Sequence, residues 1–239
     1  MISLWYYLDD MGKRTQSYGH FCLLARTLER VGDRWALLVV RDLELGPRRF
    51  TDLMELLGGI TPKTLTQRLR DLESEGIVVA DREPGRREVW YRLTPAGEEL
   101  VPTLNQLLRW GLHHASQRPP AGEEPHPEHL LRALREALEE LGSPAVRPVR
   151  WLVRVPGYGD YTVAFDGRHW SLSLGETEDR EVTITASREA LSRFLTGPPS
   201  AGGDDGPDVT IAGSPQAIQT MLAAISMFRS GSDGVSSDG

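Results

Sequence analysis

The sequence predicts an α+β protein built from two domains. In the first half, apolar residues recur every three to four positions, the period of an amphipathic helix. From residue 148 the apolar period changes to two, which is typical of strands with one buried face. Between the halves, the proline-rich polar stretch 116–127 predicts a linker of some stiffness. We therefore expect domains at 1–115 and 128–228, followed by a disordered tail at 229–239.

Charge separates the two halves of the chain. Residues 1–120 hold 17 Lys and Arg against 16 Asp and Glu, whereas residues 121–239 hold 10 against 18. The acidic second half is therefore not a nucleic-acid-binding half. Because the first half is nearly neutral, any surface for DNA there must be a local basic patch.

The sequence also indicates where the protein resides. No apolar run approaches the length of a membrane span, and residues 1–10 lack the basic start of a signal peptide. Met11 offers an alternative start to Met1. The single cysteine, Cys22, excludes an intramolecular disulfide framework and a Cys-rich zinc site. We expect a cytoplasmic protein with no membrane partner.

Three helices are predicted before residue 60. The first two lie within 20–45, divided at Gly32, and Asp33 is the expected cap of the second. Gly46-Pro47 ends the second helix. The third carries four apolar residues and ends at Gly58-Gly59. These four are Phe50, Leu53, Met54 and Leu57.

A fourth helix over 62–75 has the clearest boundaries in the chain. Thr61 can cap its first turn, Pro62 suits the first helical position, and Gly76 is the kind of residue that ends a helix. Leu65, Leu69 and Leu72 form one apolar stripe. The opposite face carries polar and cationic residues that suit phosphates and base edges, namely Lys63, Thr66, Gln67, Arg70 and Ser74. Alone, this pattern fits an ordinary surface helix equally well.

The segments around this helix favour DNA binding. A short glycine turn joins it to the third helix, which is the helix-turn-helix arrangement. Strand patterns at 77–80 and 88–93 predict a hairpin, or wing, that follows the helix. Phosphate or minor-groove contacts are expected from Thr61, Thr64, Arg82, Arg86 and Arg87. Thr94-Pro95 then opens a helix with too many apolar positions for one exposed helix, so we expect a partner helix in a homodimer.

Residues 20–115 resemble the HxlR-type winged-helix transcriptional regulators. The resemblance is carried by Cys22, Ala25-Arg26, Gly32-Asp33-Arg34-Trp35, Leu45-Gly46-Pro47-Arg48-Arg49-Phe50, Leu53, Gly59-Ile60-Thr61-Pro62-Lys63, Leu65-Thr66-Gln67-Arg68-Leu69, Leu72-Glu73, Gly76 and Leu93-Thr94-Pro95 with Gly97. It implies a homodimer that places two recognition helices on an inverted repeat of double-stranded DNA. The wing departs from the usual pattern, because its tip is shortened to 84–87.

Two possible chemical sites lie outside the predicted DNA-binding surface. In some HxlR-type proteins the cysteine that matches Cys22 senses oxidants or electrophiles; the alternative is a small apolar residue in a dimer contact. The histidines at 113, 114, 126 and 129 have no carboxylate or cysteine at ligand spacing, so we expect no metal.

The second half resembles domains of the sterol-carrier-protein fold over 145–228. A helix at 128–141 precedes four strand patterns, and Asp166-Gly167 predicts a hairpin turn. A helix at 187–196, a strand at 209–211 and a last helix from 213 follow. The resemblance implies an apolar tunnel for a hydrophobic small molecule; the alternative is a domain without a pocket that serves only packing or dimerisation.

No catalytic residues are predicted. The chain has no nucleophile elbow, no metal triad and no dinucleotide loop, and we expect no cofactor. The leading hypothesis is a sequence-specific DNA-binding regulator modulated by a hydrophobic molecule in its second domain. The alternatives are a lipid-binding or ligand-binding protein whose winged helix serves assembly, and a thiol-based redox regulator acting through Cys22.

Overall fold

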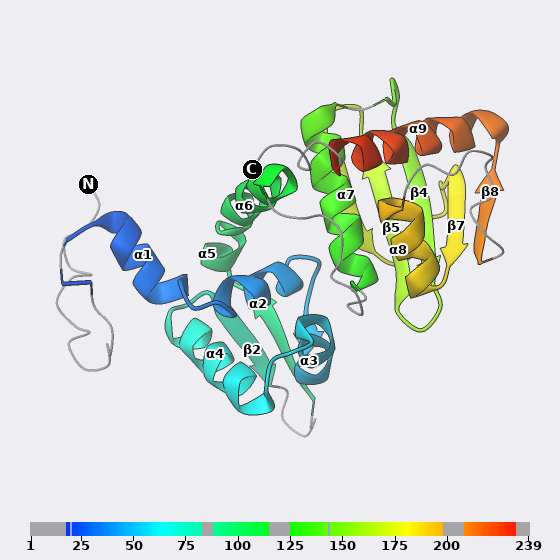
Figure 1. The fold of residues 1–239 in the computed structure, drawn as a ribbon. Helices are drawn as coiled ribbons and strands as arrows, with labels where there is room; N and C mark the ends of the chain where they lie inside the picture. The colour runs from blue at the N-terminus through cyan, green and yellow to red at the C-terminus, as the bar shows by residue number, and fades with distance from the viewer. Residues whose placement is uncertain are drawn as a thin grey trace. The chain divides into compact units, whose positions relative to one another are not determined.

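The computed structural model describes residues 18–19, 21–82, 88–114, 125–142, 144–197 and 208–232. It divides into two compact units, Met1–Val101 and Pro102–Gly239. Residues 102–114, which the sequence analysis placed in the first domain, belong to the second unit. Figure 1 shows the elements of both units. Among the described residues, no helix combines the length and hydropathy needed to span a membrane.

The first unit consists of short helices and a small antiparallel sheet. Its helices are α1 (Leu23–Val31), α2 (Ala36–Leu43), α3 (Phe50–Leu57), α4 (Pro62–Ser74) and α5 (Pro95–Glu98). Its strands are β1 (Arg48–Arg49), β2 (Val78–Arg82) and β3 (Val89–Leu93), in the order β1-β3-β2. The hairpin β2–β3 is the predicted wing. Strand β1 was not predicted, because two residues cannot show a strand period.

The core of the first unit confirms the predicted leucine stripe. Leu65, Leu69 and Leu72 of α4 are at most 2% exposed, as are Val39 and Val40 of α2. Burial of such side chains contributes roughly 1.5–3 kcal/mol each. The apolar face of α4 is therefore turned inward, and its polar face is left for solvent or a partner.

Gly97 allows α5 to approach the wing closely. A Cβ at this position would lie 2.3 Å from the carbonyl oxygen of Ile77, the residue before β2. Thr94 caps α5 by accepting a hydrogen bond from the Gly97 amide at 3.2 Å. The predicted single helix after Thr94 is divided in the structure, because α5 ends at Glu98 and α6 starts at Val101. Pro102 has no amide hydrogen to donate, which favours a new helix start here.

The second unit is a five-stranded sheet with helices. Its helices are α6 (Val101–His114), α7 (Pro127–Leu141), α8 (Arg188–Thr196) and α9 (Pro215–Ser232). Its strands are β4 (Val149–Val155), β5 (Gly159–Phe165), β6 (Trp170–Leu174), β7 (Val182–Ala186) and β8 (Val209–Gly213). The order is β6-β5-β4-β7-β8, and only β4 and β7 pair in parallel among these neighbours. α9 extends to 232, beyond the predicted start of a disordered tail at 229.

Helices α7, α8 and α9 cover one face of this sheet (Figure 1). Between sheet and helices lie several side chains that are less than 2% exposed, namely Leu131, Leu138, Trp151, Tyr161, Leu191, Leu195 and Met221. Trp170 packs against Trp151 and Phe165, with ring centroids 4.9 and 5.2 Å apart. Large side chains therefore occupy much of the layer where the resemblance implies an apolar tunnel.

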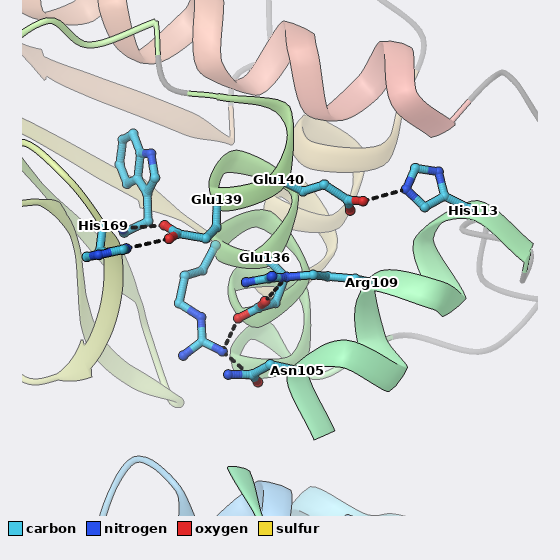
Figure 2. Close-up of polar contacts among 9 residues, drawn as sticks. Asn105, Arg109, His113, Glu136, Glu139, Glu140 and His169 are labelled. Atoms are coloured by element: carbon cyan, nitrogen blue, oxygen red, sulfur yellow. Dashed lines mark hydrogen bonds and ion pairs between the residues drawn. The ribbon is translucent and has the colours of Figure 1, made fainter. Parts of the chain in front are cut away.

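A row of polar contacts attaches α6 to α7 (Figure 2). The Arg109 guanidinium donates to Glu136 at 2.9 Å, and Arg135 donates to Asn105 at 3.0 Å. One turn further on, His113 Nε2 lies 2.9 Å from the Glu140 carboxylate. The side chains that α6 contributes are spaced four residues apart and so share one face. Polar groups therefore contribute to this contact at three positions of α6.

The same helix α7 is also tied to strand β6. Glu139 accepts hydrogen bonds from the His169 ring at 2.7 Å and from the Trp170 amide at 2.8 Å (Figure 2). Partial burial alone would raise the pKa of Glu139, but these two bonds outweigh it and lower the pKa. The carboxylate in turn raises the pKa of His169. α7 thus links α6 to the sheet.

Candidate nucleic-acid interface

Helix α4 is held at both ends as the sequence predicts. The Thr61 hydroxyl accepts a hydrogen bond from the Thr64 amide at 3.2 Å, and Pro62 occupies the first turn. At the other end Gly76 has a φ of 69°, a left-handed conformation that glycine adopts without strain. At the turn before α4, Gly58 has a φ of 61°. The short α3–α4 connection therefore has the geometry of a helix-turn-helix.

Two cations on the polar face of α4 are available to a partner. Lys63 and Arg70 are exposed, and neither forms an ion pair with any residue that the structure describes. Arg68 differs, because its guanidinium lies 3.4 Å from Asp33 and 3.2 Å from Asp71. Free cations on an exposed helix face suit phosphates and guanine edges.

The uncharged predicted contacts on α4 already form local hydrogen bonds. The Gln67 amide donates to Asp71 at 2.8 Å, and the Thr66 hydroxyl donates to the Pro62 carbonyl oxygen at 2.8 Å. The hydroxyls of Thr61 and Thr64 lie 2.8 Å apart. Hydroxyl groups keep acceptor capacity after donating one bond. Gln67 must leave Asp71 before its amide can read a base.

The wing places one predicted arginine in an ion pair. Arg82 on β2 donates to both carboxylate oxygens of Glu73 on α4, at 3.1 and 3.3 Å. This hydrogen-bonded pair raises the pKa of the Arg82 guanidinium. Solvent screens such an exposed pair and makes it weak, so a phosphate can compete for the arginine. Arg86 and Arg87 lie outside the described residues.

A further cation beside the wing was missed by the sequence analysis. Arg49 on β1 is exposed and lies over the Trp90 ring of β3, 5.5 Å from its centroid. Its guanidinium also bonds to Asp52 at 3.2 Å and approaches Glu88 at 3.4 Å. Only the pairing of β1 with β3 brings Arg49 to the wing. No local sequence pattern predicts the pairing of β1 with β3.

The structure shows the surroundings of Cys22 and of the histidines that the sequence analysis considered. Cys22 is half-buried at the N-terminal end of α1. The neighbouring apolar residues Phe21, Leu23 and Leu24 are 66–75% exposed. Among the described residues, no group of three or more His, Cys, Asp or Glu side chains could hold a metal ion. His113 instead contacts Glu140, and His126 accepts the Glu128 amide at 3.3 Å.

The arrangement of α3, turn, α4 and hairpin β2–β3 defines a winged helix-turn-helix unit. The family model described as HxlR-like helix-turn-helix matches residues 30–119. The uncharacterized HTH-type transcriptional regulator YkvN of Bacillus subtilis (strain 168) is 37% identical over 105 residues, covering 43% of this chain and 87% of YkvN. An uncharacterized HTH-type transcriptional regulator of Synechocystis sp. is 38% identical over 94 residues, covering 39% and 70%.

The chain belongs to the HxlR-like helix-turn-helix family. Membership implies a DNA-binding protein of the helix-turn-helix regulator class. Among solved structures, the redox regulator HypR in its oxidized form is 31% identical; the match covers 41% of this chain and 100% of the HypR chain, with a TM-score of 0.38. The family match ends at residue 119, before the sheet of the second unit.

Proposed function

We propose that this protein is a sequence-specific transcriptional regulator that binds an inverted repeat in double-stranded DNA as a homodimer. The observation that carries the DNA-binding part is the polar face of α4, where Lys63 and Arg70 are exposed and without ion pairs among the described residues. Lys63, Thr66, Gln67 and Arg70 would enter the major groove. Arg82 and the wing would contact phosphates or the minor groove.

A binding measurement on DNA from upstream of the gene tests this proposal. Arg70→Ala should cost about 1–3 kcal/mol and relax preference at one base position if Arg70 reads a base. Arg180→Ala, which removes the same charge from the second unit, is the control and should bind as wild type does. Equal loss on all DNA sequences would reassign Arg70 to a phosphate. Absence of salt-sensitive, sequence-preferring binding would refute the proposal.

Exposed apolar residues on two helices support the homodimer. On α1, Leu23 and Leu24 are 69% and 66% exposed, and on α6 Leu107 and Trp110 are 52% and 62% exposed. Each pair lies on one helix, and leaving such residues in water is unfavourable compared with covering them by a second copy. A dimer would also set the spacing between two copies of α4.

Light scattering on charged variants tests the dimer. Leu24→Asp and Trp110→Asp should each shift the protein towards monomer and weaken binding to an inverted repeat. Leu174→Asp alters a residue of β6 that is 40% exposed and serves as the control. A wild-type protein that stays monomeric at micromolar concentration would refute the homodimer, while leaving DNA binding to be judged separately.

Modulation by a hydrophobic small molecule is the third part of the proposal. Its support is the order of elements from α7 onwards: α7 is followed by three antiparallel strands, a crossover, a strand, a helix, a strand and a helix. This order resembles the sterol-carrier-protein fold. The polar row between α6 and α7 offers a physical route by which a movement of α7 could shift α6. Native mass spectrometry of freshly purified protein tests for a bound apolar ligand.

The alternatives are separated from this proposal by simple measurements. A ligand-binding protein whose winged helix serves only assembly predicts bound lipid without DNA binding. Redox regulation through Cys22 predicts that Cys22→Ser binds DNA but no longer responds to oxidants or quinones. The cytoplasmic location stays a prediction.

A further inference from the structure

The second unit has an open cavity on the face of its sheet that is turned away from the helices. Its volume is about 300 Å³. The floor consists of small side chains from β5 and β6, namely Thr162, Ala164, Ser171 and Ser173. Arg150 of β4 stands at one side, and the backbone of 175–177 lies at another. The size is at the lower end of the range for small-molecule sites in proteins.

Strand register explains why this face is hollow. Arg150 pairs with Ala164, and Ala164 pairs with Ser171, so these three form one row across the sheet. The next row joins Leu152, Thr162 and Ser173. Because partners in a row point to the same face, small residues lie side by side on two adjacent strands. Because these side chains are short, they leave the space above the sheet that forms the cavity.

The connection from β6 to β7 forms a wall of the cavity. These strands lie on opposite sides of the β5–β4 pair, so residues 175–181 must cross both strands. The Thr162 hydroxyl donates to the Gly175 carbonyl oxygen at 2.8 Å, and the Glu181 amide donates to the Arg150 carbonyl oxygen at 2.9 Å. This crossing explains why Leu152, which points away from the helices, is fully buried.

The charges around the cavity leave one cation without a partner. Arg154, on the same face, is paired with Asp160 at 3.2 Å and with Glu176. The exposed guanidinium of Arg150 forms no hydrogen bond or ion pair with the described residues. Glu176, an acid at the rim, is bound to Arg154 and does not pair with Arg150.

Asp166, the other acid at the rim, is engaged by backbone amides. Its carboxylate accepts hydrogen bonds from the amides of His169 at 2.8 Å and Arg168 at 2.7 Å. These bonds lower the pKa of Asp166. The carboxylate therefore holds the β5–β6 turn in place and does not form an ion pair with Arg150.

We propose that this cavity binds a small organic anion whose carboxylate or phosphate group is held by Arg150 and by the hydroxyls of Ser171 and Ser173. A guanidinium can hold two oxygens of such a group at once, and charge-assisted hydrogen bonds are the stronger kind. Ala164 on the floor supplies apolar surface for the rest of the molecule. The site lies on the opposite face of the sheet from the proposed apolar tunnel, and it does not depend on the DNA-binding role.

A titration of the full chain followed by amide NMR tests this site. The probes are sodium benzoate and inorganic phosphate, each compared with sodium chloride at equal ionic strength. Binding should cause saturable shifts of the amides of Ser171, Ser173 and Gly175. Arg150→Gln should weaken the affinity at least about tenfold, since hydrogen bonds to charged groups contribute on that scale. Arg168→Gln removes an exposed arginine from the neighbouring turn and should leave the affinity unchanged.

A second variant separates binding from general charge effects. Ser171→Ala removes a hydroxyl from the floor without enlarging the side chain, and should weaken binding of the preferred probe several-fold. The probe that saturates at lower concentration identifies the carboxylate or the phosphate as the preferred group. The proposal is overturned if neither probe gives saturable shifts, or if Arg150→Gln and Arg168→Gln bind with the wild-type affinity.

Discussion

Helices α4 and α7 look alike as sequences but differ in what their arginines do. Both have a polar cap followed by proline and a leucine stripe. On α4, Arg70 is exposed and free of ion pairs with described residues, whereas on α7 Arg132 and Arg135 are 2% and 8% exposed and bound to Glu128 and Glu136. An arginine on a helix face therefore indicates a binding surface only when no carboxylate of the fold pairs with it; a paired arginine belongs to a structural contact.

The largest expected effect comes from breaking a pair on α7. Glu136→Ala would leave Arg109 and Arg135 without the buried carboxylate that they share. Because removing one partner leaves an uncompensated charge, we expect a loss of about 3 kcal/mol in the free energy of unfolding. Urea denaturation followed by tryptophan fluorescence measures this loss.

Glu140→Ala is the matched control for that measurement. Its carboxylate is 34% exposed and contacts His113, so its loss should cost less than about 1 kcal/mol. If Glu136→Ala and Glu140→Ala lowered the free energy of unfolding equally, burial would not explain the difference between their two contacts. The comparison between α4 and α7 would then lose its physical basis.

A smaller effect, on binding instead of stability, is expected from Lys63→Ala on α4. If Lys63 contacts a phosphate, affinity should fall by a similar factor on specific and unrelated DNA. The slope of log affinity against log salt should become shallower by about one for each lost contact. Fluorescence anisotropy at several salt concentrations measures the slope, and the free energy of unfolding should stay at the wild-type value. An unchanged slope would show that Lys63 contacts no phosphate.

The smallest effect is expected at the exposed pair of His169 and Glu139. The pKa of His169 is raised in the folded protein, so the pair contributes stability below the unfolded pKa of His169 and loses it as pH rises through the folded pKa. The pKa of Glu139 is lowered, so the contribution is also lost as pH falls through that folded pKa. NMR titration of the His169 ring should show a raised midpoint that returns towards its ordinary value in Glu139→Gln. An unchanged midpoint in that variant would contradict the pairing.

The local elements of this protein were predictable because their signals are contained in a few neighbouring residues. Thr61, Pro62 and Gly76 mark the ends of α4, and the structure confirms the Thr61 cap and the left-handed Gly76. Asp166-Gly167 likewise predicts the β5–β6 turn, where Gly167 has a φ of 104°. Caps and tight turns satisfy backbone groups within one or two turns of chain, so sequence alone determines them.

The tertiary structure decided what depends on residues far apart in the chain. It paired β1 with β3, which brought Arg49 to the wing. It also arranged the strands as β6-β5-β4-β7-β8, with a connection that crosses the sheet and borders the cavity at Arg150. Whether an arginine lacks an ion pair with the described residues, like Arg70, or has one, like Arg135, follows from which carboxylates the fold places within reach. Sequence period specifies which face of an element is buried, but it contains no information about which distant face will pack against it.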